Sequence, residues 1–319
     1  MAQGMSTDPS SIEPDAAGAW RADRPLLTDP DRQFARCYNK SSFMFEHGFT
    51  GNPIFELPQL VALSRRLPAH PYFAYWSNGP VSIDDRWEKG ERVRTSLQET
   101  IAEIARNNSL VIMKHVEQDP VYAPYLQKFL GQIVDFCGPE MRDDVQVGEV
   151  LILVSSPNRV TSYHIDAETN YLVQVTGNKT VHVFPHDQPA VVSDIELERF
   201  HAGDFNGAVY KETSQASATT YDLRAGCGIH IPTHAPHWVQ NGDNVSVALS
   251  VNFELKSVAD LAMVYRFNRW VRRAGVEPSS PGVHPERDSA KRAVAKTALT
   301  VKKLIRPADA GPAWATWTP

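Results

Sequence analysis

The sequence predicts a mainly β protein with flanking helices, whose core is a sandwich or barrel of the jelly-roll kind. Between residues 145 and 253, short apolar runs alternate with turn residues, a pattern typical of many short strands. On both sides of this stretch, apolar residues recur at helical spacing instead. A chain of 319 residues, 42% of them hydrophobic, can bury a large core without disulfides.

The residues before the β-rich stretch are expected to form a tail and then a mostly helical segment. Residues 1–35 are rich in Pro, Asp, Ala and Ser and lack periodicity, which is typical of a mobile tail. In the helical segment, 36–109, Ser96 and Glu99 form a capping box at the start of a helix. The expected elements are helices at 57–67 and 96–106, a strand at 110–113 and a helix at 121–136.

The core, residues 110–255, carries most of the predicted strands. These strands are expected at 150–154, 170–175, 179–184, 219–223, 228–231 and 245–253. The tripeptide Thr176-Gly177-Asn178 is typical of a hairpin turn, and it predicts that the strands on either side pair with each other. The polar stretch 185–218 is expected to be an insertion between strands, with a short helix at 194–200.

The C-terminal residues 256–319 are predicted to be helices and a tail. Ser257 is expected to cap a helix over 257–274, with Asp260 three positions later. A second helix, 286–305, has an apolar stripe and an opposite basic face that we expect to be solvated. The stripe consists of Val294, Ala298, Val301 and Ile305, and the basic face of Lys291, Arg292, Lys296, Lys302 and Lys303.

Composition excludes several classes of protein. The net charge of -5 gives no basic excess for general nucleic-acid binding, and no DNA-binding motif is recognisable. Three widely spaced cysteines provide neither a disulfide framework nor a cysteine zinc site. The first residues lack the apolar stretch of a secretory signal, and no run is long enough to span a membrane, so we expect a cytoplasmic protein.

One of three histidine–acid pairs has the surroundings of a metal site. The pattern His-x-Asp/Glu begins at His115, His164 and His284, so the pattern alone is weak. The second pair lies in the β-rich stretch, where His164 and Asp166 would point to the same side of an extended chain. A later histidine on a neighbouring strand would complete two imidazoles and a carboxylate, the ligand set of non-haem Fe(II) oxygenases.

Two histidines compete to be the third ligand. His237 follows Pro236, whose fixed φ helps to place it, and it leads into an apolar run that resembles a strand. His234 is instead expected to be a partly exposed loop histidine. We therefore predict a metal bound by His164, Asp166 and His237.

Lys179 interrupts a largely apolar strand after the predicted hairpin. A lone lysine on a strand is usually exposed, but an inward lysine is credible when it has a carboxylate partner. An oxygenase that uses a dicarboxylate cosubstrate needs such a cation beside the metal.

The residues from Thr161 to Lys179 resemble the core of the cupin-like JmjC oxygenases, a family that includes the asparaginyl hydroxylase factor inhibiting HIF. In that family a Thr three before the first metal His, an Asn six after it and a Lys fifteen after it bind 2-oxoglutarate. An Asn fifteen after the distal His belongs to the same pattern. The matching residues are Thr161, Asn170, Lys179 and Asn252, and the resemblance covers roughly residues 110–255.

The resemblance implies a double-stranded β-helix (cupin) core that binds Fe(II) and 2-oxoglutarate. It implies hydroxylation of a protein or peptide side chain or of a small metabolite, with release of succinate and CO2. It also implies dimerisation through the C-terminal helices. Two positions depart from the family pattern: Cys227 replaces an acid, and Leu110 lies near the place of a tyrosine that helps to hold 2-oxoglutarate.

Two other functions compete with an oxygenase. A metal-binding cupin without oxygenase activity, such as an isomerase, would need neither Lys179 nor Thr161. A regulatory binding module would be expected to carry a DNA-binding motif or reader domain, and the sequence has neither. The entrance to the site is expected to be lined by Tyr163, Glu168, Trp238 and Gln240.

Overall fold

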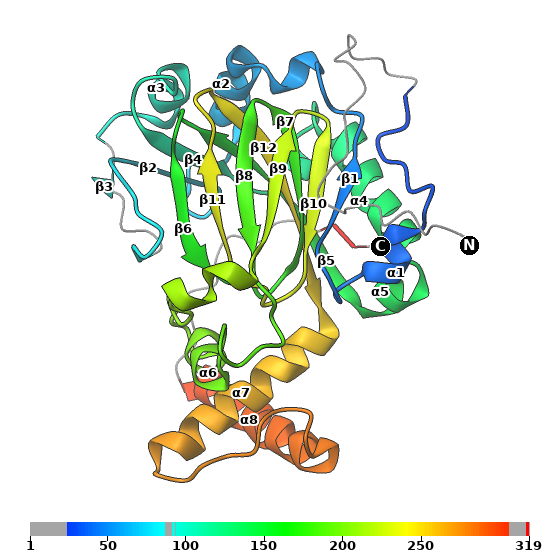
Figure 1. The fold of residues 1–319 in the computed structure, drawn as a ribbon, viewed down its shortest axis with the longest axis vertical. Coiled ribbons are helices and arrows are strands. Elements are labelled where there is room, and N and C mark those ends of the chain that lie inside the picture. Colours follow the sequence, from blue (N-terminus) through cyan, green and yellow to red (C-terminus); the bar gives the residue numbers. More distant parts are fainter. Residues whose placement is uncertain (1–23, 87–90, 93, 306–316, 319) are drawn as a thin grey trace, which may run out of the picture.

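Two antiparallel sheets face each other, with helices around them, in a computed structural model that describes residues 24–86, 91–92, 94–305 and 317–318 (Figure 1). The larger sheet has the strand order β1 (Phe43–Glu46), β10 (Cys227–Ile231), β7 (Thr169–Thr176), β12 (Ser246–Leu255), β5 (Val145–Ser155), β4 (Ser109–Met113), β2 (Ala74–Asn78) and β3 (Glu91–Arg92). The smaller sheet has the order β6 (Val160–His164), β11 (His237–Asn241), β8 (Asn178–Val183) and β9 (Thr219–Arg224).

The connections between the sheets confirm the predicted jelly-roll core. From β5 to β8 each successive strand lies in the other sheet, and β9 to β12 alternate in the same way. All of the strand pairs are antiparallel. Strands that are distant in the sequence, such as β6 and β11, therefore become neighbours.

The predicted hairpin at residues 176–178 is wrong. Strand β7 pairs with β10 and β12, whereas β8 pairs with β11 and β9, so the turn crosses from one sheet to the other. Gly177 has a φ of 77°, and a Cβ there would lie 2.3 Å from Asn244 Oδ1. Glycine therefore allows both the left-handed backbone and the close approach of the neighbouring loop.

Helices surround the two sheets, and α4 covers the outer face of the larger one (Figure 1). The helices are α1 (Gln33–Cys37), α2 (Leu57–Arg66), α3 (Leu97–Ala102), α4 (Ala123–Cys137), α5 (Pro139–Asp144), α6 (Asp194–His201), α7 (Lys256–Arg273) and α8 (Pro285–Ile305), with 3₁₀ turns η1 (Pro53–Phe55), η2 (Val116–Gln118) and η3 (Glu212–Ser217). Leu126, Phe129 and Ile133 of α4 lie in the main core with Val150 and Ile152 of β5. Within the described ranges, none of these helices is long and apolar enough to cross a membrane.

The N-terminal segment is less helical than the sequence suggests. The capping box of Ser96 and Glu99 is present at α3. However, β1, β2 and β3 extend the larger sheet within the segment that we expected to be helical. Residues 24–35 of the expected tail include the buried side chains Leu26, Leu27 and Phe34, whereas residues 1–23 lie outside the described residues.

The two C-terminal helices differ from the prediction in their details. Helix α7 begins at Lys256, and Ser257 does not cap it, because its backbone N–H and Oγ donate to Asp144 instead. Asp260 accepts hydrogen bonds from Arg292 and Lys296 of α8. These ion pairs join part of the basic face of α8 to α7, but the side chains of Arg292 and Lys296 stay 39% and 56% exposed, as expected. The expected solvation is wrong for Lys291, which is buried, and the side chains of Lys302, Lys303 and Ile305 lie outside the described residues.

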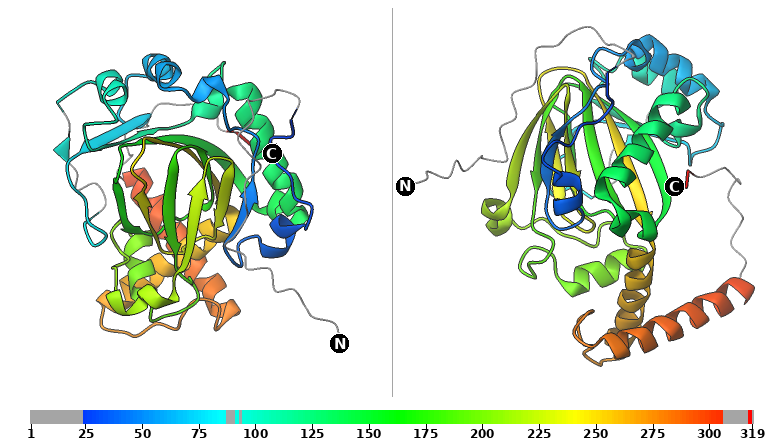
Figure 2. Two further views of the ribbon diagram at one scale, coloured as in Figure 1. Left: turned by 45° about the horizontal axis from the view of Figure 1, so that its top comes forward. Right: turned by 90° about the vertical axis from the view of Figure 1, so that its right-hand side faces the viewer.

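Part of the apolar stripe of α8 therefore points outward. Val294 and Val301 are 53% and 47% exposed, whereas Lys291 is buried and donates to Ser279. Figure 2 shows α8 at one end of the molecule, beyond the sheets, where α7 lies between it and the core. The periodicity of the stripe was correct, but the side that packs was assigned incorrectly.

Candidate metal centre

The two candidate histidine ligands lie opposite each other on neighbouring strands. His164 is the last residue of β6, His237 is the first residue of β11, and the register pairs them directly. Their ring centroids are 4.1 Å apart. A bulge between His237 and Val239 shifts the register, so Thr161 is paired with Val239. Since side chains of paired residues share a face, this bulge puts His164 and Thr161 on the same face, three residues apart.

Asp166 approaches both histidines from the loop after β6. Its Oδ2 lies 3.9 Å from His164 Nε2 and 3.6 Å from His237 Nε2. Each of the three residues offers one ligand atom, and these three atoms all lie within 4.8 Å of one another. In the described part of the chain, no other three histidine, cysteine or acidic residues come together in this way. Asp166 is 36% exposed and His237 only 7%, so the group is open on the side of the carboxylate.

The hydrogen bonds of both imidazoles leave Nε2 available to a metal. His164 Nδ1 lies 2.8 Å from the carbonyl of Ser162, and His237 Nδ1 lies 3.0 Å from that of Ala235. A carbonyl only accepts, so each Nδ1 carries a proton, and each Nε2 is the ring atom that can bind a metal. Burial, followed by the nearby His164, lowers the pKa of His237 to about 4, which keeps this ring neutral at neutral pH.

His234, the competing histidine, points elsewhere and is buried, so the expected partial exposure is wrong. It has a left-handed backbone, with a φ of 61°, and its N–H donates to the carbonyl of Asp166 at 3.0 Å. Its Nε2 lies 2.8 Å from Nε2 of His201 on α6. Burial lowers the pKa of His234 to about 3, so its ring is also neutral. The structure brings His237 to the metal group and places His234 behind it.

The other two histidine–acid pairs do not assemble three ligands among the residues that the structure describes. His115 Nε2 lies 3.3 Å from Glu149 Oε1, and the ring of Tyr72 stacks on His115. Glu117 accepts a hydrogen bond from the backbone of Val150. His284 lies 3.9 Å from Glu286 on the surface.

Lys179 is buried on the same face of the smaller sheet as His237. It is 5% exposed, and no hydrogen bond or ion pair joins its ammonium group to any described residue. Burial lowers the pKa of Lys179 from 10.5 to about 8. Lys179 lies four residues along β8 from Val183, which is paired with His237, a backbone separation of roughly 13 Å. This distance leaves room for a small dianion between the ammonium group and the metal group.

Lys179→Met is expected to stabilise the ligand-free protein. Between about pH 8 and pH 10.5 the unfolded chain binds this proton while the folded chain does not, so stability rises with pH across that window. Below about pH 8 the buried lysine is charged, and burying this charge lowers the free energy of unfolding by ~3 kcal/mol. Urea unfolding near pH 7 and near pH 10.5 checks this expectation. The variant should have a higher free energy of unfolding than the wild type at pH 7, and this difference should shrink as the pH rises. A difference that stays the same would contradict the assigned burial of the charge.

Two amides lie on the facing surface of the larger sheet. Asn170 of β7 and Asn252 of β12 are paired in the register, and Asn170 Nδ2 donates to Asn252 Oδ1 and to Ser250 Oγ. Asn170 Oδ1 is buried and accepts no hydrogen bond from any residue that the structure describes. The unpaired carbonyl oxygen and the unpaired ammonium group of Lys179 are both unusual inside a protein, where buried polar groups normally have partners.

Three of the four expected entrance residues do not line the site. Trp238 and Gln240 alternate with the inward residues of β11, so they lie on the outer face. Trp238 stacks on His182, with ring centroids 3.9 Å apart, and Gln240 donates to the carbonyl of Asn158. Tyr163 is buried with an apolar cluster beyond the smaller sheet.

The fourth residue, Glu168, does lie close to the metal group. Burial and the charge of Asp166 raise the pKa of Glu168 to about 7. Two contacts were missed from the sequence. Ser250, which lies two residues before Asn252 and on the same strand face, could have been found from alternation, whereas no local pattern indicated that His201 contacts His234.

Comparisons with known proteins find solved structures of the same fold, but no matching family model or curated protein. The solved structures that match include Escherichia coli YcfD, at a TM-score of 0.50 and 15% identity, covering 86% of this chain and 68% of YcfD. A second YcfD structure is described as a ribosomal oxygenase in complex with cobalt and 2-oxoglutarate. It matches at a TM-score of 0.50 and 15% identity, covering 89% of this chain and 69% of YcfD. The chain therefore shares the jelly-roll fold and flanking helices of these structures.

Proposed function

We propose that this protein, which shares the fold of a ribosomal oxygenase, is an Fe(II)- and 2-oxoglutarate-dependent oxygenase. The observation that carries the proposal is the combination of two groups on one face of the smaller sheet. His164, Asp166 and His237 offer a metal three ligands, and Lys179 offers a dicarboxylate a buried positive charge. A metal-binding cupin without oxygenase activity would leave the burial of Lys179 without a purpose.

The residues present fit both Fe(II) and 2-oxoglutarate. Two neutral imidazoles and one carboxylate are the ligand set of oxygen-activating iron, and three protein ligands leave positions for the cosubstrate and O2. The buried ammonium group of Lys179 and the buried Oδ1 of Asn170 both lack partners in the described residues. A bound dicarboxylate would supply the missing partner of Lys179.

Each side chain then has a separate task. The backbone carbonyls of Ser162 and Ala235 orient the imidazoles of His164 and His237 toward the metal. Lys179 pairs with the distal carboxylate of 2-oxoglutarate, and Thr161 donates its hydroxyl to the same group. Asn170 and Asn252 provide amide groups from the opposite sheet. When bound, the iron supplies the activation of O2, with succinate and CO2 as products.

A succinate-release assay tests this proposal. The purified protein is incubated with 2-oxoglutarate, O2 and ascorbate, with or without added Fe(II). Succinate that forms only with Fe(II) supports the oxygenase, whereas metal binding without succinate and without 2-oxoglutarate binding would favour the alternative cupin. Anaerobic co-crystallisation with Fe(II) and 2-oxoglutarate would then identify the contacts of Lys179 and Asn170.

We further propose a protein or peptide side chain as the substrate. The fold neighbour YcfD is described as a ribosomal oxygenase, which is the support for this choice over a small metabolite. Incubation of the enzyme with a cell extract under ¹⁸O2, followed by peptide mass spectrometry, would detect a labelled hydroxyl group. Label found only in the metabolite fraction would favour the small-molecule alternative. The cytoplasmic location expected from the sequence stays a prediction.

The exposed face of α8 supports a proposal that the protein is a homodimer through its C-terminal helices. Val294 and Val301 are seven residues apart, so they share one face of α8 and point away from α7. Val294→Glu is expected to halve the molar mass measured by size exclusion with light scattering, because a charge opposes burial of this face. Val121→Glu, an exposed valine beside α4, is the matched control and should leave the mass unchanged. A monomeric wild type would refute the dimer.

A further inference from the structure

We propose that His201, on the insertion helix α6, is a positioning residue for the metal centre. It hydrogen bonds to His234, and the main chain of His234 holds the loop that carries Asp166. This inference rests on the proposed metal centre, and it assigns a purpose to the insertion at residues 185–218. It concerns a residue that does not touch the metal and acts only through its neighbour.

His234 joins the segments of two metal ligands. Its N–H donates to the carbonyl of Asp166 at 3.0 Å, and it lies three residues before His237 on the same short loop. The next residue, Ala235, accepts the hydrogen bond from His237 Nδ1. A shift of His234 would therefore change the position of Asp166 and the orientation of His237 together.

The backbone of His234 needs an external support. Its φ of 61° is a left-handed conformation that is uncommon for residues other than glycine. Such a conformation persists when surrounding contacts hold it in place. Its side chain makes one hydrogen bond beyond the metal loops, of 2.8 Å to His201 Nε2, and both rings are buried. Looser edge-to-face contacts with Phe200 and Tyr265, at ring-centroid distances of 6.4 and 6.3 Å, add to this support.

His201 is itself held by the C-terminal helix α7. Tyr265 stacks on the His201 ring, with centroids 5.3 Å apart and planes 9° from parallel. Arg266 Nε donates to the carbonyl of His201 at 2.6 Å. One turn earlier on α6, the fully buried Glu198 accepts two hydrogen bonds from Arg272, at 2.9 and 3.0 Å. The C-terminal end of α6 therefore has little freedom to move.

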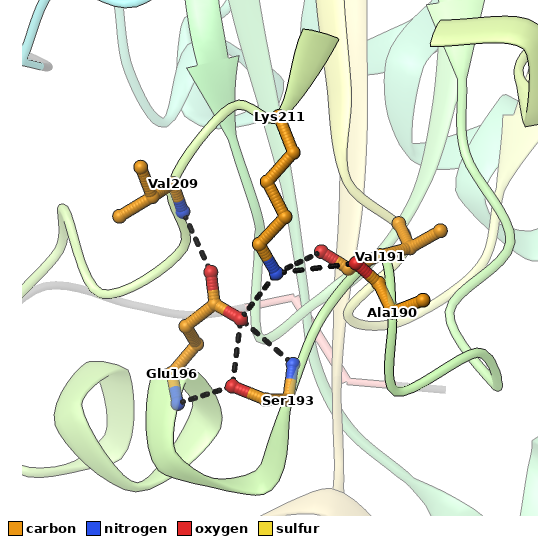
Figure 3. A network of polar contacts seen from close by, with 6 residues as sticks. All are labelled: Ala190, Val191, Ser193, Glu196, Val209 and Lys211. Atoms are coloured by element: carbon orange, nitrogen blue, oxygen red, sulfur yellow. Dashed lines mark hydrogen bonds and ion pairs between the residues drawn. The ribbon is translucent and has the colours of Figure 1, made fainter. Parts of the chain in front are cut away.

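The N-terminal end of α6 is fixed by a second network (Figure 3). Ser193 caps the helix in a reciprocal pair with Glu196, whose Oε1 also accepts from the backbone N–H of Val209 at 3.0 Å. Lys211 Nζ donates to Glu196 Oε2 and to the carbonyl of Val191, both at 3.0 Å. Since both ends of α6 are anchored, His201 is a rigid support for His234.

Loss of the His201 side chain should therefore weaken metal binding. Groups that orient metal ligands from outside the coordination shell typically contribute 10–100-fold to metal affinity. Because His201 acts through the main chain next to the ligands, we expect His201→Leu to raise the dissociation constant for Co²⁺ by about ten-fold. His201→Gln places a nitrogen near the position of Nε2, and it should restore the affinity to within about three-fold of the wild type.

The test is a titration of the metal-free protein with Co²⁺, followed by calorimetry and visible absorption. The wild type, His201→Leu, His201→Gln and Arg66→Met are compared after unfolding temperatures have been measured. Arg66→Met breaks the ion pair between Arg66, the last residue of α2, and Asp119, far from α6, and serves as a destabilised control. It should lower the unfolding temperature and leave both the affinity and the Co²⁺ spectrum unchanged.

Each outcome decides a different question. A wild type that binds no Co²⁺ would refute the proposed metal centre, and with it this inference. A wild type and His201→Leu with equal affinities would refute only the role of His201. Weakening by Arg66→Met to the same degree, or no rescue by His201→Gln, would also overturn it, because general destabilisation would then explain the loss. If His201→Leu does not fold, His201→Ala replaces it, since alanine is well tolerated in a helix.

Discussion

Asp166→Ala is expected to abolish succinate formation from 2-oxoglutarate. Asp166 provides the only carboxylate of the ligand group, and its Oδ2 lies 3.9 Å from Nε2 of His164 and 3.6 Å from Nε2 of His237. Without it, two neutral histidines remain, and a dication loses its only negatively charged protein ligand. The variant should also retain little iron after gel filtration. Succinate formation and iron content, measured on the same preparation, check both expectations.

The control for this experiment is a carboxylate on the outer face of the smaller sheet. Asp222 of β9 is exposed and accepts a hydrogen bond from Thr180, so Asp222→Ala should fold and turn over like the wild type. If Asp166→Ala kept wild-type turnover, the assigned metal centre would be wrong. The backbone carbonyl of Asp166 still accepts from His234 in the variant, which limits the change to the side chain.

Lys179→Ala is expected to weaken 2-oxoglutarate binding by roughly a hundred-fold or more. Removal of one partner from a buried charge pair costs roughly 3–5 kcal/mol, and each 1.4 kcal/mol corresponds to about ten-fold in affinity. In the ligand-free protein the ammonium group has no partner among the described residues, so the full effect should appear on binding. Anaerobic equilibrium dialysis of labelled 2-oxoglutarate against the metal-loaded protein measures it.

Co²⁺ affinity provides the control for Lys179→Ala, because this residue is distant from the metal ligands along β8. The variant should bind Co²⁺ as the wild type does and lose only the cosubstrate. An unchanged affinity for 2-oxoglutarate would remove Lys179 from the proposed site. Loss of Co²⁺ binding as well would show that the substitution disturbs the sheet, and Lys179→Met would then be the variant to use.

The mainly β core could be predicted from the sequence, because its strands have local signals. Alternation and turn residues mark most of the strands, and the three proposed metal ligands come together where strand pairing puts them. Turn chemistry was less informative. The tripeptide Thr176-Gly177-Asn178 can form either a hairpin turn or a connection between two sheets. The pairing of β7 and β8 with other strands decides which of these forms.

Tertiary contacts explain the remaining differences. The apolar periodicity of α8 identifies a stripe but not the side that packs, which the ion pairs of Asp260 with Arg292 and Lys296 decide. Trp238 and Gln240 lie one and three residues after His237, and side chains at odd separations along a strand point to opposite faces, so neither enters the site. His201 had no local signal, because its partner lies in another segment of the chain.

The position of β11 between β6 and β8 has a consequence for the order in which this protein assembles. His164 and Lys179 lie on β6 and β8, which each pair with β11 and not with each other. Before β11 has been synthesised and paired, the chain therefore lacks His237, the third ligand. It also lacks the strand that joins His164 on β6 to Lys179 on β8. Such non-local pairing is slow to form. Binding of the proposed iron should then be a late event in folding, because the ligand set is complete only after β11 has paired with β6.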